Sequence, residues 1–149
     1  MTSSNLKIIS LFICVVLIFP RCKEENLTEA VPDYSGKWEG LASDDGQLGT
    51  GGLSVFTLNI SQAGSNISGS VIVRKAAYAE SYSGTIAGKI VSSGGLYGLE
   101  CNFSLIINSC NVSVLLNAVK NYGQLVGNHN GTNSCKGKIT GGTFVLDKK

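Results

Sequence analysis

Apolar and polar residues alternate with a period of two over most of the chain beyond residue 34. In the last quarter of the chain, Val112, Val114 and Leu116 recur at every second position. This period is typical of β-strands that bury one face. The triplet Asn121-Tyr122-Gly123 interrupts it with residues that favour a turn, so this quarter predicts a long hairpin that continues into a closing strand. Its predicted strands are Asn111–Val119, Gln124–Asn130 and Thr143–Leu146, with turns at 131–134 and at Gly141-Gly142.

Earlier segments repeat the alternation between glycine-rich breaks. The chain has 19 glycines and 2 prolines, a composition typical of many short strands joined by tight turns. About eight strands are predicted, which favours an all-β fold: a small antiparallel up-and-down β-barrel, closed so that no sheet edge is free. The earlier predicted strands are one that begins near Gly36, then Leu53–Gln62, Ile67–Arg74, Tyr82–Ala87, a short continuation at Ile90-Val91 after a turn at Gly88-Lys89, and Tyr97–Ile107.

Two cysteines fall opposite each other in the predicted hairpin. With its turn centred between Tyr122 and Gly123, an antiparallel ladder places Cys110 opposite Cys135. Directly opposed residues have Cβ atoms about 4.5–5.5 Å apart, within reach of a disulfide. Such a bridge would close a loop of roughly 25 residues and add about 3 kcal/mol of stability. The alternatives are two reduced thiols or a bridge from Cys101 to Cys135; without a partner, Cys101 is predicted to be a small buried hydrophobe.

The first 21 residues have the composition of a targeting segment. Lys7 precedes an apolar run, Ile8–Phe19, that is too short to cross a hydrocarbon core about 30 Å thick as a helix. Cys22 follows soon after this run, an arrangement that resembles the signal of bacterial lipoproteins, in which the cysteine is lipidated after cleavage. Arg21 departs from that pattern, because a small residue normally precedes the cysteine. An ordinary secretory signal that leaves Cys22 as a thiol is the alternative.

The lipoprotein resemblance also implies a division of the chain and a location. It implies a signal peptide at 1–21, a polar tether at 22–33 and a barrel domain at 34–149. The protein would then be held in the cell envelope, at the outer membrane, by its N-terminal lipid, on the periplasmic or the surface side.

The start of the barrel carries a second resemblance. Tyr34-Ser35-Gly36-Lys37-Trp38 places a Gly-x-Trp motif at the head of the first strand, and it resembles the opening of lipocalins and avidin-type barrels, where the tryptophan closes one end. Together with Ile60-Ser61-Gln62 and Asn133-Ser134-Cys135, it resembles a group of uncharacterised bacterial lipoproteins with lipocalin-like or avidin-like barrels. That resemblance implies a fold and brings no known activity. The second lipocalin signature is absent and Trp38 is the only tryptophan, which argues against biotin as a ligand.

Charge and residue inventory exclude several function classes. Lys7 and Arg21 lie in the targeting segment, so 10 basic and 10 acidic residues remain beyond it, and no basic field is left to attract nucleic acid. His129 is the only histidine, too few for a histidine-rich metal site, and it is predicted at a strand end or barrel mouth. No catalytic or phosphate-binding motif is present. The sequence therefore predicts neither an enzyme nor a cofactor or metal.

Two functions agree with such a barrel. The first is a cup for a small hydrophobic ligand, and the second is a solid barrel that serves as a structural or protein-interaction module of the cell envelope. Interior volume distinguishes them, because large inward side chains fill a barrel of this size. The sequence does not set the oligomeric state. The predicted ligand-lining residues are Trp38, Phe56, Leu58, Phe103, Leu105 and Val114.

Overall fold

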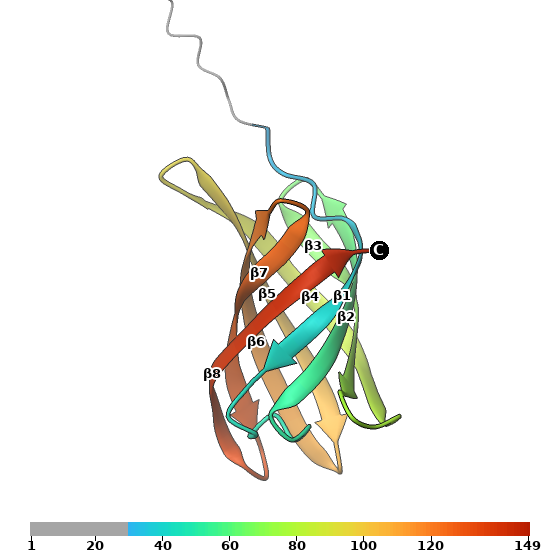
Figure 1. Ribbon diagram of the computed structural model, residues 1–149. Helices are drawn as coiled ribbons and strands as arrows, with labels where there is room; N and C mark the ends of the chain where they lie inside the picture. Colours follow the sequence, from blue (N-terminus) through green and yellow to red (C-terminus); the bar gives the residue numbers. More distant parts are fainter. Residues whose placement is uncertain (1–29) are drawn as a thin grey trace, which may run out of the picture.

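A computed structural model describes residues 30–149 of the chain. These residues form one closed antiparallel barrel in which each strand pairs with its sequence neighbours and the last strand pairs with the first (Figure 1). The predicted all-β, eight-stranded, up-and-down barrel is confirmed, and it is consistent with a lipocalin-like fold. The predicted signal peptide and Cys22 lie outside the described residues. The strands are β1 (Gly36–Ser43), β2 (Leu53–Ala63), β3 (Asn66–Lys75), β4 (Ser81–Ser93), β5 (Leu96–Ile107), β6 (Cys110–Asn121), β7 (Gln124–Asn133) and β8 (Gly137–Lys148).

The barrel has two distinct ends. At the entry end, where residues 30–35 join β1, the chain also makes the β2–β3, β4–β5 and β6–β7 turns (Figure 1). At the far end lie the loop 44–52 between β1 and β2, and the β3–β4, β5–β6 and β7–β8 connections. Every second residue of each strand points inward, and these residues form one aliphatic and aromatic core.

The register of the last hairpin matches the prediction. Asn121 pairs with Gln124 and Val112 pairs with Asn133, so Cys110 and Cys135 lie at the end of the same ladder. They form a disulfide with a Cα–Cα distance of 5.7 Å, and Cys101 is a buried free thiol. The predicted bridge is therefore confirmed, and the alternative Cys101–Cys135 pairing is wrong.

Two predicted turns are wrong, and a third, predicted at 131–134, begins only at Ser134; glycine is the reason in each case. Gly88-Lys89 lies inside one continuous strand, β4; Gly131 lies inside β7, and Gly141-Gly142 inside β8. Glycine favours turns, but inside a strand it also permits a close approach of the neighbouring backbone. A Cβ atom on Gly88 would fall on the carbonyl oxygen of Glu100 in β5. A glycine in a strand therefore marks a bend of the barrel wall as readily as a turn.

Six glycines on the inner face repeat this arrangement. At each of them an added Cβ would fall on a backbone carbonyl oxygen of the adjacent strand. The strands cross closely at these points, which lets a sheet of eight strands curve tightly enough to close. These residues are Gly40, Gly69, Gly84, Gly88, Gly127 and Gly131.

Candidate functional site

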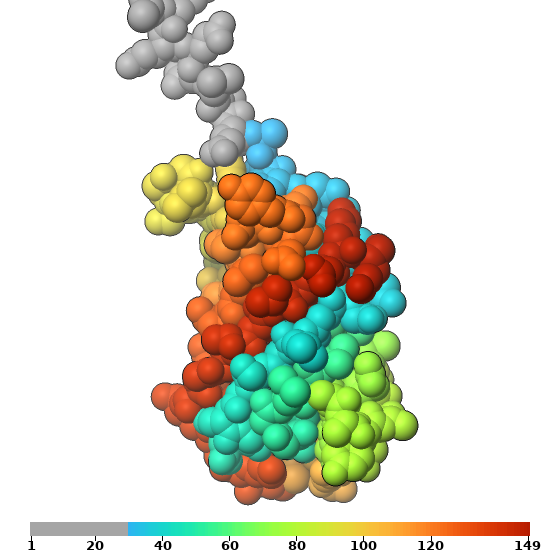
Figure 2. Space-filling model, in the orientation of Figure 1, coloured from blue at the N-terminus to red at the C-terminus, as the bar shows by residue number. Residues whose placement is uncertain are grey.

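The entry end of the barrel is closed by the segment that precedes β1. The Tyr34 side chain is fully buried, and its hydroxyl donates a hydrogen bond to the Tyr97 carbonyl oxygen at 3.2 Å. Trp38, also fully buried, donates from Nε1 to the Tyr34 carbonyl oxygen at 2.8 Å. Gln62 accepts from the Tyr34 backbone N–H and donates to the Pro32 carbonyl oxygen. The described part of the predicted tether is thus fastened across this end (Figure 2).

The far end is closed by the loop 44–52. Leu48 is fully buried, and the Asn133 amide donates to the carbonyl oxygens of Gln47 and Leu48 at 3.0 and 3.3 Å. The Asp45 carboxylate accepts from the backbone N–H and the hydroxyl of Thr140, and the hydroxyl contact is the main cause that lowers the pKa of Asp45. Side chains and backbone of the protein itself therefore cover both ends of the barrel.

The six predicted ligand-lining residues all point inward. Each is at most 3% exposed, and they belong to one packed cluster. The rings of Phe56 and Phe103 meet edge to face with their centroids 5.9 Å apart, a favourable aromatic geometry. Large side chains of the protein thus occupy the centre of the barrel. These six residues are Trp38, Phe56, Leu58, Phe103, Leu105 and Val114.

His129 lies deeper than the predicted barrel mouth. Its side chain is 1% exposed and packs against the rings of Phe56 and Phe144, with centroids 5.3 and 6.3 Å from its own. The imidazole occupies the space in which a side chain at Gly142 would stand. Neither ring nitrogen has a hydrogen-bond partner among residues 30–149. Burial lowers the pKa of His129 below its ordinary value of 6.5, and the charges of Asp44 and Asp45 oppose that effect only in part.

This burial predicts a pH-dependent stability. In the unfolded chain His129 takes up a proton near pH 6.5, whereas the folded barrel keeps it neutral to a lower pH. This contribution to stability is therefore fully present above the unfolded pKa of about 6.5, and it is lost as the pH falls from there toward the lower pKa of the folded state. The free energy of unfolding measured in urea should be lower at about pH 5.5 than at about pH 7.5 by up to about 1 kcal/mol. Both pH values lie above the range in which carboxylates ordinarily titrate.

The variant His129→Leu is the control for this effect. It removes two buried nitrogens without partners, so it should fold with similar or higher stability than the wild type. Its free energy of unfolding should be the same at both pH values. An equal pH dependence in the variant and the wild type would show that another group causes it.

Cys101 is the remaining thiol of the described barrel. It is fully buried on the inner face of β5, as predicted, and burial is the main cause that raises its pKa to about 12. The thiolate is the reactive form of cysteine, so Cys101 acts as a small core residue. Within residues 30–149 no cluster of three or more His, Cys, Asp or Glu side chains could hold a metal ion. The same residues contain no helix that is long and apolar enough to span a membrane.

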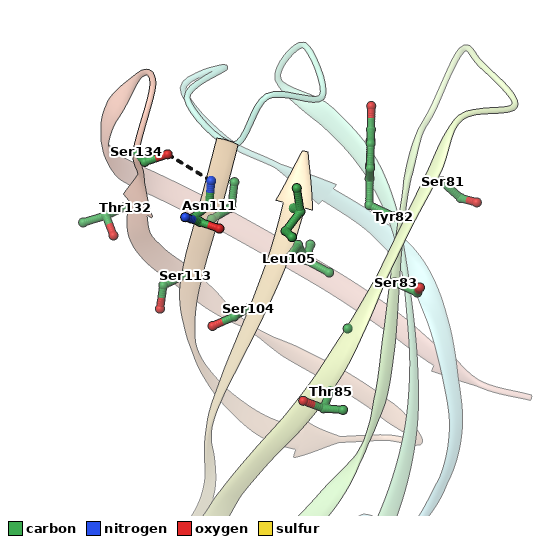
Figure 3. A pocket seen from close by; sticks show the side chains of 13 residues that line it. Ser81, Tyr82, Ser83, Thr85, Ser104, Leu105, Asn111, Ser113, Thr132 and Ser134 are labelled. Carbon is green, nitrogen blue, oxygen red and sulfur yellow. Dashed lines mark hydrogen bonds between the residues drawn. The ribbon is translucent and has the colours of Figure 1, made fainter. Parts of the chain in front are cut away.

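The outer surface carries a hollow that sequence reasoning missed. It has a volume of about 880 Å³ and lies across β4, β5, β6 and the end of β7, at the far end of the barrel. Figure 3 shows Leu105 on β5 and Tyr82 beside β4 at this end, with serine and threonine side chains of the neighbouring strands around them. In the sequence, this hollow is indicated only by serine and threonine residues at successive outward positions of these strands. The polar residues that line it are Ser81, Ser83, Thr85, Ser104, Asn111, Ser113, Thr132 and Ser134.

Another part of the outer face carries a row of apolar side chains. Leu41 in β1 pairs with Val55 in β2 and with Val145 in β8. Val145 pairs in turn with Val126 of β7, which pairs with Val119 of β6. Cross-strand pairs of this kind stabilise a sheet. The row therefore supports the barrel wall from outside, although Leu41, Val119 and Val145 remain 56%, 51% and 44% exposed.

No protein family matches this chain, and no curated protein or solved structure matches it either. A function for the barrel is therefore argued from its geometry.

Proposed function

We propose that this chain is an exported cell-envelope protein, held at the outer membrane by a lipid on Cys22, whose solid barrel serves as an interaction module through its outer surface. One observation carries the choice of a solid barrel: the inward positions are filled by large side chains, and the chain covers both ends. A small hydrophobic ligand inside would have to displace residues such as Phe56 and Phe103. The packed interior thus favours an interaction module over a ligand cup. The proposal includes no catalytic step and no cofactor.

Export is supported by the disulfide and by the N-terminal pattern. Cys110 and Cys135 form a bridge, and disulfides persist in oxidising compartments outside the cytoplasm. The tether is fastened at the entry end, where Lys120 donates from Nζ to the Asp33 carbonyl oxygen at 2.9 Å. A lipid anchor upstream of this point would hold the entry end toward the membrane and present the far end to the surroundings.

Native mass spectrometry of the protein purified after export tests the solid interior. We expect the folded and the unfolded protein to have the same mass, reduced by two hydrogens for the Cys110–Cys135 bridge. A small molecule that is lost on unfolding would instead identify the barrel as a ligand cup and reveal the class of its ligand.

The anchor is tested by the variant Cys22→Ala, followed by separation of membrane and soluble fractions. We expect the wild type in the membrane fraction, and the variant in the exported soluble fraction or as an unprocessed precursor. Cys101→Ala is the matched control, because it removes a buried thiol of the core and should leave the distribution unchanged. A wild-type protein that is soluble after export would contradict the lipid anchor.

A further inference from the structure

The outer hollow coincides with an interruption of the barrel wall. The paired register of β4 and β5 runs from Ser93↔Leu96 to Ile86↔Phe103, although β4 begins at Ser81 and β5 continues to Ile107. The ladder thus ends at Ile86 and Phe103, although Gly84 still lies against the Ser104 carbonyl oxygen; the stretch without a paired neighbour in this ladder, 81–83 and 106–107, lies under the hollow. Backbone donors and acceptors of 81–83 and 106–107 that point across this interruption are therefore candidates to contact a ligand.

The interruption is bounded at its outer end. The Tyr82 hydroxyl donates to the Asn108 side-chain oxygen at 3.4 Å and to Glu80 at 3.2 Å, which connects β4 to the β5–β6 turn. Glu80 is itself paired with Lys75 at 2.6 Å. The hollow therefore lies over a bounded interruption of the barrel wall, which we call the window. The last ladder pair, Ile86 and Phe103, marks one end of the window, and the contact between Tyr82 and Asn108 marks the other. A window closed at both ends suits a compact ligand better than an extended strand that would have to run through it.

The lining combines a polar rim with an apolar floor. Seven serine and threonine side chains and the Asn111 amide supply donors and acceptors, and among residues 30–149 no charged side chain lines the hollow. The apolar floor is supplied by exposed Ile106 and the half-buried Tyr82 ring, whereas Leu105 and Val112, 3% and 1% exposed, lie beneath it as part of the packed core (Figure 3). Burial of a charged group here would lack a partner of opposite charge. A fully apolar ligand would leave the rim hydroxyls without partners.

The rim is also held in place before any ligand arrives. Ser134 accepts at Oγ from the Asn111 backbone N–H at 2.9 Å, and its own N–H donates to the Asn111 carbonyl oxygen at 2.8 Å. The Cys110–Cys135 disulfide joins the same two strand ends. A rim fixed in this way loses little conformational entropy on binding.

We propose that this window binds a short neutral oligosaccharide. A sugar ring has an apolar C–H face that fits the floor of Ile106 and the Tyr82 ring, and hydroxyls around its edge that match the serine and threonine rim. The volume of about 880 Å³ lies within the range of about 300–1,000 Å³ for small-molecule sites. The window is at the end of the barrel opposite residues 30–35. This inference rests on the proposed function, in which that end faces the surroundings.

The test is a ¹H–¹⁵N NMR titration of the exported protein with cellotriose, maltotriose and N,N′,N″-triacetylchitotriose in turn. We expect at least one of them to shift amide signals of 83–85, 104–106 and 111–113, with a Kd on the order of 1 mM or below. The variant Ser104→Lys places a long charged side chain in the window and should weaken binding by at least about tenfold. Ser68→Lys is the matched control, because Ser68 is exposed on β3, outside the window, and it should bind as the wild type does.

Three results would overturn the proposal. They are no shift with any trisaccharide, shifts that lie outside the window, and binding that Ser104→Lys leaves intact. Shifts at the window from a neutral tetra-alanine peptide, with none from the sugars, would assign the site to strand addition instead. None of these outcomes affects the solid interior or the lipid anchor, which the mass and fractionation experiments test separately.

Discussion

Replacement of Trp38 with alanine should lower the free energy of unfolding by about 4 kcal/mol, the typical cost of removing a large buried aromatic side chain. Trp38 is fully buried in the core at the entry end, and its Nε1 donates to the Tyr34 carbonyl oxygen. Lys148 Nζ lies 5.5 Å from the ring centroid. The substitution therefore opens a cavity and also releases the segment that covers this end. Urea unfolding followed by circular dichroism measures the loss, since Trp38 is the only tryptophan and its fluorescence disappears with it.

Trp38→Phe separates the two contributions. It keeps an aromatic ring in the core and removes the N–H donor, so it should cost less than half as much as alanine. Amide exchange at Tyr34 should accelerate in both variants, because both lose the hydrogen bond that fastens this residue. A loss of stability in Trp38→Ala below about 1 kcal/mol, the level of an ordinary surface change, would mean that this end is not closed as described.

Gly127→Ala should destabilise the barrel by about 3 kcal/mol although it adds a single methyl group. Gly127 faces inward on β7, and an added Cβ would fall on the carbonyl oxygen of Asn117 and lie 2.8 Å from the Cα of Ala118. These atoms belong to the backbone of β6, which pairs with β7 at this point, so they cannot move aside without breaking the ladder. The midpoint of thermal or urea unfolding measures the effect.

Gly98→Ala provides the matched control on the outer face of β5. There an added Cβ would meet the Ala118 carbonyl oxygen at 3.4 Å and a Val91 methyl at 3.6 Å, which are ordinary contacts. This variant should be neutral, or more stable by about 0.5 kcal/mol, because alanine lowers the entropy of the unfolded chain. Equal destabilisation in the two variants would show that strand glycines act through something other than the close approach of neighbouring strands.

The strand count and the register of the last hairpin followed from local features of the chain. An alternation of apolar and polar residues reports one buried face whatever the strand packs against. A two-residue turn fixes which residues oppose each other, so the position of Tyr122-Gly123 was enough to pair Cys110 with Cys135. The predicted lining residues also pointed inward, because the same alternation decides the face.

Features that depend on contacts between neighbouring strands were not predicted from the sequence. The glycines at 88, 131 and 141–142 were interpreted as turns, since nothing in their neighbours states how closely another strand approaches. His129 was placed at a barrel mouth, because its depth depends on Phe56, Phe144 and the space at Gly142, which come from other strands. The polar residues of the window were visible in the sequence as scattered serines and threonines.

The sequence by itself determined an all-β chain, the inward and outward faces of its strands, and the disulfide partners. These properties depend on residue periodicity and turn chemistry over short distances. Only the tertiary structure decided that the interior is filled, that Tyr34 and Leu48 cover the two ends, and that the β4–β5 ladder ends at Ile86 and Phe103. Those properties depend on how eight strands curve around a common core, and side chains far apart in sequence then compete for the same volume.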